Sequence, residues 1–200
     1  MGTPPHRPHG SPPDSYQGPR RALILSGGGM RVSYQAGVVR ALLEAGLCFT
    51  HADATSGGAI NLAMLLSGLS PAEMCERWCT LTLMDTVSLM PLAKYLKVDD
   101  LSALGDADGF VRRAIPHFGI DFPRINAAEG IDASFNVLNY TRKVNEVIPH
   151  GAIDLDLLIA GISLPGILPP VRKGEWLYQD AAFVRDANLM EMVRRGAEEL

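Results

Sequence analysis

Short apolar runs and helical apolar spacing alternate along the first part of the chain. The apolar run at residues 22–25 ends at three consecutive glycines, residues 27–29, as expected of a buried parallel strand. From residue 30 to residue 45 the apolar positions recur with a helical period, and Gly46 follows as a stop signal. The pattern therefore predicts a strand, a glycine-rich turn and a helix, which together make one βα unit.

The same order of elements occurs a second time further along the chain. Residues 49–55 are a second predicted strand, and residues 59–67 are apolar on every side, which is typical of a helix buried against a sheet. A further helix is predicted to begin at Pro71, because Ser70 is a good N-cap residue and Glu73 completes a capping box.

The second half of the chain predicts three more strands and two more helices. The expected strands are residues 131–138, 143–149 and 176–179, and the expected helices are residues 154–162, capped by Asp154, and 188–200. Four Pro and Gly residues within 163–171 exclude regular structure there, and residues 105–130 are expected to be connecting helix and loop. Residues 81–98 are rich in Leu and Met, which suits either an ordinary core or a groove for flexible acyl chains.

Composition predicts one domain that follows a flexible segment. Residues 1–20 contain six prolines and almost no apolar side chains, so we expect a disordered Pro/Gly-rich tail. With 47% hydrophobic residues in the chain, residues 21–200 are enough for one domain with a substantial core. The net charge of −4 gives no polyanion-binding surface, so nucleic acid is not an expected partner.

Cysteine content and hydropathy favour a cytoplasmic protein. The three cysteines, Cys48, Cys75 and Cys79, have no partners at metal-ligand spacing, which indicates free thiols and predicts neither a metal nor a cofactor. No apolar stretch reaches the length of a membrane-spanning helix, and the apolar run after Arg21 is too short for an export signal. We therefore expect a cytoplasmic protein, which is compatible with a position at the periphery of a membrane.

Candidate chemistry lies between the second strand and its helix, around Ser56. Four small residues let the incoming strand and outgoing helix nearly touch there, and they are Ala54, Gly57, Gly58 and Ala59. Such a sharp turn holds a serine hydroxyl clear of its own backbone, as a nucleophile requires. The stretch differs from Gly-x-Ser-x-Gly by one methyl group, and on its own a Gly-rich turn with a Ser or Thr helix cap also explains it.

Two further features are expected at the same edge of the sheet. Consecutive glycines before a helix expose backbone N–H groups at its positive end, which favours a phosphate or an oxyanion. Met30 and Arg31 follow the glycines where a P-loop needs Gly-Lys, and Val32 replaces the third glycine of a dinucleotide fingerprint, so nucleotide binding is the weaker alternative. Because Asp180 ends a predicted strand, we expect the glycine loop, Ser56 and Asp180 to converge.

Three motifs, in this order, resemble those of the patatin-like phospholipases, a family of serine lipid acyl hydrolases. Residues 26–31 resemble the oxyanion-hole loop of that family, residues 54–59 its nucleophile elbow, and residues 160–171 the proline-rich segment before its catalytic aspartate. Asp180 stands where that aspartate belongs. The resemblance extends from Ala22 onward and implies a three-layer α/β/α fold with a mainly parallel central sheet.

The resemblance also implies a function and a set of site residues. It implies a phospholipase A or lysophospholipase-type enzyme that cleaves acyl esters of a lipid or phospholipid, with transient contact to a membrane surface. Ser56 would be the nucleophile and Asp180 the base of a dyad without histidine. The expected oxyanion-hole residues are Gly27, Gly28, Gly29 and Gly57. Arg31 is expected either to bind the substrate or to be an ordinary arginine on the helix surface.

Departures from the family pattern keep two alternatives open. Side chains add bulk near the site at Ala54, Val32, Ala181 and Ala182, which is consistent with a weakened enzyme or an inactive lipid-binding scaffold of the same fold. The second alternative is an α/β-hydrolase-type esterase with a histidine base, but the histidine of that class follows the acid and none follows Asp180 here. The family continues into another strand after the last helix, so residues 21–200 are also consistent with a truncated catalytic domain.

Overall fold

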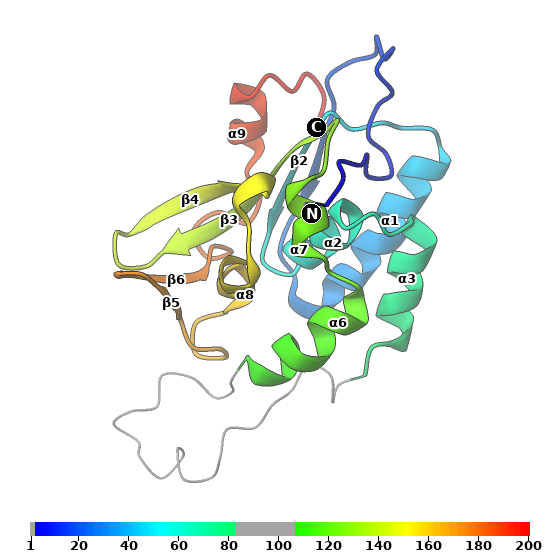
Figure 1. Ribbon diagram of the computed structural model, residues 1–200. Coiled ribbons are helices and arrows are strands. Elements are labelled where there is room, and N and C mark those ends of the chain that lie inside the picture. The colour runs from blue at the N-terminus through cyan, green and yellow to red at the C-terminus, as the bar shows by residue number, and fades with distance from the viewer. Residues whose placement is uncertain (1–2, 83–106) are drawn as a thin grey trace, which may run out of the picture.

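A mixed six-stranded sheet forms the centre of the structure, a computed structural model that describes residues 3–82 and 107–200 (Figure 1). Its described strands follow the order β1-β2-β3-β6-β5, and β4 also pairs with β3. The strands are β1 (Ala22–Leu25), β2 (His51–Thr55), β3 (Asp132–Asn139), β4 (Val144–Pro149), β5 (Val171–Lys173) and β6 (Trp176–Asp180). The predicted α/β class is confirmed.

Strand β3 pairs with three other strands. β1, β2 and β3 are parallel to one another, whereas β4 and β6 pair with β3 in antiparallel fashion. The stretch of β3 that pairs with β4 overlaps the stretches that pair with β2 and with β6, so β4 takes one edge of β3 alone. β2 and β6 therefore share the other edge and meet end to end, with Thr55 opposite Asn136 and Asp180 opposite Val137.

Helices flank this sheet, and most of them match the predicted segments. They are η1 (Gly29–Val32), α1 (Ser33–Glu44), α2 (Gly58–Leu66), α3 (Pro71–Thr80), the π-helix η3 (Phe110–Ala114), α6 (Ile115–Phe118), α7 (Phe122–Asn126), η4 (His150–Ala152), α8 (Leu155–Ile162) and α9 (Leu189–Arg194). Figure 1 shows α1, α2 and α3 on one side of β2 and α9 on the other.

The two faces of the sheet differ in polarity, because successive side chains of a strand point to opposite faces. Alternate positions of the parallel strands enter the main core beside α1, α2 and α8, among them Leu25, Ala54 and Phe135. The intervening positions of β2 and β3 are equally buried but polar, and they are Asp53, Thr55, Ser134 and Asn136. One face of the sheet therefore supports the core, while the other holds a buried polar cluster.

Helix α9 covers part of the polar face and supplies the third layer of the fold. Met192 of α9 and Ala197 pack with Ala22 in a separate small cluster, against which Ile24 also packs. Because Ala22 and Ile24 alternate with the core residues of β1, this cluster lies on the opposite face of the strand from α1. Helices on both faces give the expected three-layer arrangement.

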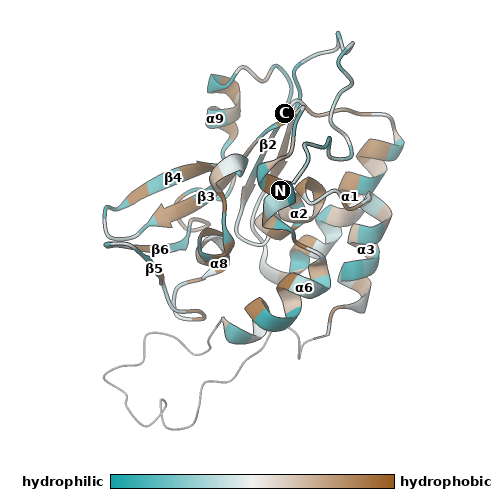
Figure 2. Ribbon diagram, viewed as in Figure 1, coloured by the Kyte–Doolittle hydropathy of each residue, from teal (hydrophilic) through white to brown (hydrophobic). Residues whose placement is uncertain are grey.

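Local capping signals set the helix starts as predicted. The Ser70 hydroxyl accepts a hydrogen bond from the Glu73 amide (3.3 Å), and the Glu73 carboxylate accepts one from the Ser70 amide (2.7 Å). Asp154 caps α8 by accepting from the Leu157 amide (3.0 Å). Figure 2 shows alternating hydrophilic and hydrophobic bands along α3, as an amphipathic helix that packs on one side requires.

The helix predicted over residues 188–200 is shorter than expected, since α9 ends at Arg194. Gly196 adopts a left-handed conformation (φ +95°), and the Ala197 amide donates back to Met192 O (2.9 Å), which is a C-terminal helix stop. The chain then runs beside the start of β1, where the Ala22 amide donates to Glu199 O (2.8 Å). The prediction missed the stop because Gly196 lies inside an otherwise helical pattern.

Residues 3–20 are irregular and lie against the rest of the described chain, and the expected disordered tail stays a prediction. The His6 ring lies 3.0 Å from Leu66 O, and the Phe49 amide donates to Gly10 O (2.8 Å). Pro8 and Pro12 are buried. The low apolar content of this segment gave no sign of these contacts, because a histidine ring, backbone groups and proline rings make them.

Two expectations concern segments at or beyond the edge of the described residues. The Leu/Met-rich segment 81–98 lies outside them from residue 83 onward, so both of its interpretations stay predictions. The expected connecting segment 105–130 is described from residue 107 and contains short helices and loops. None of the helices described is both long and apolar enough to cross a membrane.

Candidate active site

Ser56 lies at a strained turn between β2 and α2. β2 ends at Thr55 and α2 begins at Gly58, so only two residues connect them. Ser56 has a φ of +54°, a left-handed conformation that is costly for a residue with a Cβ and that is seen at tight functional turns. The side chain is 6% exposed. The predicted sharp strand-to-helix turn is therefore present, with the serine at its apex.

Glycine is required beside Ser56 because the helix start crosses β1 closely. A Cβ at Gly58 would lie 2.7 Å from Ser26 O and from the backbone carbonyl carbon of Leu25, closer than real Cβ contacts. A Cβ at Gly57 would lie 2.8 Å from Gly29 O. Both positions bring the turn against the first βα loop, so the glycines let Ser56 approach the glycine loop.

Asp180 forms a direct hydrogen bond with Ser56. Ser56 Oγ donates to Asp180 Oδ2 (2.6 Å), and the other carboxylate oxygen accepts the Ala182 amide (2.8 Å). Asp180 is 1% exposed, and this burial raises the pKa of its carboxyl group above the ordinary value, while the bonds from Ser56 and Ala182 oppose the rise. A buried carboxylate is thus held against a buried hydroxyl, which is the geometry of a nucleophile and its base.

The pairing of the strands explains why these two residues meet although they are far apart in sequence. β2 and β6 approach from opposite directions along one edge of β3, and each ends at the meeting point. The expected convergence is therefore present. Its cause differs in part from the expected one, because β6 is antiparallel to β3 and does not follow the direction of β2.

The glycine loop lies beside Ser56, as expected. A Cβ at Gly27 would lie 2.9 Å from Ser56 Cβ and 3.4 Å from Ser56 Oγ. Gly29 has a φ of +56°, which favours glycine, and it begins the helical turn η1. The first N–H groups of a helix have no intrahelical acceptor, so Gly28 and Gly29 are suited to bind an oxyanion.

Gly27 differs from the other expected oxyanion donors. Its amide donates to Asp186 Oδ1 (2.8 Å), so this N–H group already has a charged acceptor. Asp186 was not among the residues expected at the site from the sequence. Arg31 is exposed, and its Nε lies 3.4 Å from Gly28 O, which places the guanidinium beside the loop.

A buried asparagine, also missed from the sequence, holds the start of α1. Asn61 of α2 donates to Val32 O (2.8 Å) and to Gln35 Oε1 (3.1 Å), and it accepts from Trp78 Nε1 (2.7 Å). Gln35 in turn donates to Ser26 O (2.6 Å), next to the glycines. Because Asn61 is fully buried, these bonds fix the glycine loop from the core side.

The residues that depart from the family pattern fit into the packing. Ala54 is 1% exposed within the core, and Ala181 is fully buried. Val32 is 2% exposed and contacts the glycines, since a Cβ at Gly57 would lie 3.0 Å from its methyl groups. Ala182 uses its amide to bind Asp180. The added methyl groups leave the bond between Ser56 and Asp180 in place.

A second buried carboxylate, that of Asp53, lies in β2 on the polar face, three residues before Ser56. It accepts hydrogen bonds from Ser134 (2.6 Å) and from Asn136. Burial raises the pKa of Asp53 to about 6, although these bonds lower it. Asn136 also donates to Thr55 Oγ1 (3.0 Å), so the cluster braces the end of β2.

The histidines lie outside the contacts of Ser56 and Asp180. The His150 ring nitrogens lie 3.2 Å from Ala133 O and 3.1 Å from Ala128 O, and the His51 ring lies near Thr50 and Arg195 O. The partners of the His150 ring are therefore backbone carbonyls, and those of the His51 ring are the Thr50 hydroxyl and a backbone carbonyl. In the described part of the chain, no cluster of three or more His, Cys, Asp or Glu side chains is placed to hold a metal ion.

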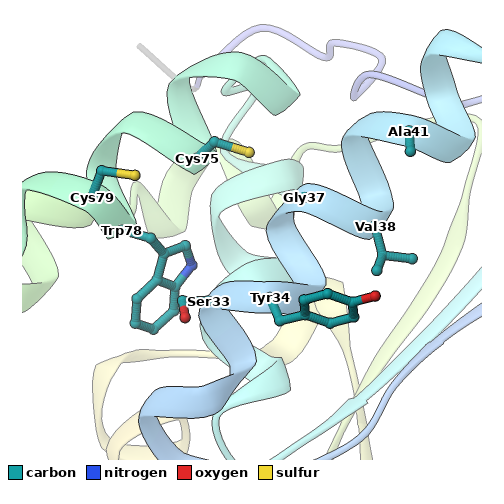
Figure 3. A pocket seen from close by; sticks show the side chains of 8 residues that line it. All are labelled: Ser33, Tyr34, Gly37, Val38, Ala41, Cys75, Trp78 and Cys79. Atoms are coloured by element: carbon teal, nitrogen blue, oxygen red, sulfur yellow. The ribbon is translucent and has the colours of Figure 1, made fainter.

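An apolar groove of about 620 Å³ lies between α1 and α3, away from the serine (Figure 3). Its lining residues are Ser33, Tyr34, Gly37, Val38, Ala41, Cys75, Trp78 and Cys79, and neither Ser56 nor Asp180 is among them. Figure 3 shows Cys75 and Cys79 on successive turns of α3. The bond between serine and aspartate, rather than the size of this groove, therefore locates the candidate active site.

Comparison with known proteins identifies a family and a structure with a similar fold. The sequence model described as patatin-like phospholipase matches residues 23–193. A search of curated proteins found no match. The crystal structure of VipD from Legionella pneumophila is similar, with a TM-score of 0.56 and 13% sequence identity over 86% of this chain and 47% of VipD. The chain thus spans about half the length of VipD, and at this identity the similarity concerns the fold alone.

Proposed function

We propose that this chain, which belongs to the patatin-like phospholipase family, is a lipid acyl hydrolase that uses Ser56 as nucleophile and Asp180 as base. One observation carries the proposal, namely the 2.6 Å hydrogen bond from Ser56 Oγ to the buried Asp180 carboxylate. The strained φ of Ser56 and the adjacent glycine loop support it, because both are expected of a nucleophile at a sharp turn beside an oxyanion site.

The proposed first half-reaction forms an acyl-enzyme. Asp180 takes the proton of the Ser56 hydroxyl while Oγ attacks the ester carbonyl carbon, and the carbonyl oxygen becomes an oxyanion. When the tetrahedral intermediate collapses, the bond to the alcohol breaks and Asp180 returns the proton to the leaving alkoxide. The acyl group is then bound to Ser56 as an ester, and the alcohol part of the lipid leaves.

The second half-reaction releases the acid and restores the serine. Asp180 takes a proton from a water molecule, which attacks the acyl-enzyme carbonyl. The second tetrahedral intermediate collapses with the proton passing to Ser56 Oγ, so a free fatty acid leaves and the dyad is restored. A carboxylate is a weak base at its ordinary pKa of about 4, so the raised pKa of buried Asp180 favours both proton transfers.

The proposed oxyanion donors are the amides of Gly28, Gly29 and Gly57. Each such donor is worth roughly 3 kcal/mol in the transition state of an acyl transfer. Gly27 is left out of this set, because its amide already donates to Asp186. We propose that Arg31, exposed beside this loop, attracts the phosphate of a phospholipid substrate.

Contact with a lipid surface is part of the proposal. Met30 follows the glycine loop and is 52% exposed, and Phe183, three residues after Asp180, is 77% exposed. Two large apolar side chains on the loops that carry the site suit transient insertion among acyl chains. The substrate is therefore expected at a membrane or micelle surface.

A fluorophosphonate probe tests the nucleophile directly. Wild-type protein should label, and Ser56→Ala should not, whereas the exposed control Ser15→Ala should label like wild type. Hydrolysis of p-nitrophenyl esters should increase from acetate to medium and long acyl chains. Well-folded wild type that does not label would instead indicate a lipid-binding scaffold, and a steep preference for acetate would contradict the lipid assignment.

A further inference from the structure

Asp186 contacts the glycine loop on the side away from the core. Its Oδ1 accepts the Gly27 amide at 2.8 Å. A Cβ at Gly27 would lie 2.5 Å from that oxygen and 2.9 Å from Ser56 Cβ, so Gly27 is held between Asp186 and the nucleophile. No side chain other than hydrogen fits there, which shows how closely the carboxylate approaches the loop.

The segment that carries Asp186 is fixed to the sheet on both sides of that residue. Thr55 Oγ1 donates to Arg185 O (3.4 Å), which joins the segment to the end of β2. Asn188 is 1% exposed and donates to Asn136 Oδ1 (2.9 Å), which joins it to β3. Although the Asp186 side chain is exposed, its backbone is therefore anchored to the strands that position Ser56.

We propose that Asp186 is a positioning residue that sets the glycine loop for oxyanion binding. By holding the Gly27 amide, it withdraws that group from the reaction and orients the following amides of Gly28 and Gly29 toward the carbonyl oxygen of the substrate. This inference rests on the proposed hydrolase function. Asp186 would hold the loop on its outer side, while Asn61 and Gln35 hold it on the inner side.

The charge and the hydrogen bond of Asp186 act in opposite directions on the transition state. The hydrogen bond orders the loop, which favours an oxyanion at Gly28 and Gly29. The negative charge opposes a developing oxyanion at the loop, although it also contributes to the raised pKa of Asp180. Asparagine at this position keeps an acceptor oxygen for the Gly27 amide and removes the charge, whereas alanine removes both. The two substitutions therefore separate the two effects.

Steady-state kinetics on p-nitrophenyl octanoate compare wild type, Asp186→Asn and Asp186→Ala. Asp186→Ala should lower kcat about 10- to 100-fold with KM within about threefold of wild type, because the lost contact orders donors that act mainly in the transition state. Asp186→Asn should keep kcat at the wild-type level or raise it up to about tenfold. Glu175→Gln, an exposed acid in the turn between β5 and β6, is the matched control and should behave like wild type.

Amide hydrogen exchange of Gly27, measured by NMR, gives a readout that does not depend on activity. Exchange should be slow in wild type and in Asp186→Asn, and about tenfold or more faster in Asp186→Ala. Equal Gly27 exchange in wild type and Asp186→Ala would overturn the inference, even if the protein proves to be no hydrolase. In an active enzyme, a wild-type kcat for Asp186→Ala, or equal losses in both variants, would overturn it as well.

Discussion

Gly58→Ala should destabilise the protein strongly, because the added methyl group has no space beside β1. The new Cβ would lie 2.7 Å from Ser26 O, so this atom must move by about 0.7 Å to reach ordinary contact at 3.4 Å. Leu25, also in contact, belongs to a strand whose backbone is paired with β2, so the neighbour cannot yield easily. Overpacking typically lowers the free energy of unfolding by about 1–3 kcal/mol. Because the neighbour here is rigid backbone, we expect Gly58→Ala to lower it by about 3 kcal/mol.

Gly37→Ala is the matched control for this substitution. Gly37 lies inside α1, and a Cβ there would have no atom within 4 Å. The substitution should therefore stabilise the protein by about 0.5–1 kcal/mol through helix propensity alone. With a urea m-value of about 2 kcal/mol/M, Gly58→Ala should lower the unfolding midpoint by about 1.5 M. Equal midpoints for the two variants would refute the requirement for glycine at the turn.

Two other predictions concern the polar face and the lipid surface. The pKa of Asp53 is about 6 in the folded protein and about 3.9 in the unfolded chain, so its contribution to the free energy of unfolding should fall by about 2 kcal/mol from pH 4 to pH 7. Asp53→Asn should remove this loss in urea titrations at several pH values, and an unchanged pH dependence would contradict the raised pKa. Phe183→Ser should reduce hydrolysis of vesicle phospholipids about tenfold while sparing a soluble short-chain ester, and parallel losses on both would argue against insertion of the side chain.

Local signals in the sequence account for most elements of the fold. The glycines after β1, the capping box at Ser70 and the apolar run of α2 each depend on neighbours within a few residues, so a linear pattern reveals them. The same holds for the turn at Ser56, because small residues must flank it. The family resemblance and strand ends were then enough to expect Asp180 beside it.

Long-range contacts account for what the sequence did not reveal. The direction of β6 depends on its pairing with β3, and β5 is a three-residue strand that follows a segment rich in proline. The contact between Asp186 and Gly27 joins residues 159 positions apart. Exposed charged residues follow no periodic pattern. Neither the spacing nor the composition of the surrounding sequence therefore marks Asp186 as part of the site.

The most direct test of the proposed dyad is kcat for Asp180→Asn beside that for His150→Ala. Asparagine preserves the shape of the side chain but removes the proton acceptor, so kcat should fall by roughly three orders of magnitude. The described hydrogen bonds of the His150 ring go only to backbone carbonyls, so His150→Ala should keep kcat within about threefold of wild type. If both variants fold, and the histidine variant is inactive while Asp180→Asn keeps its activity, Asp180 is not the base.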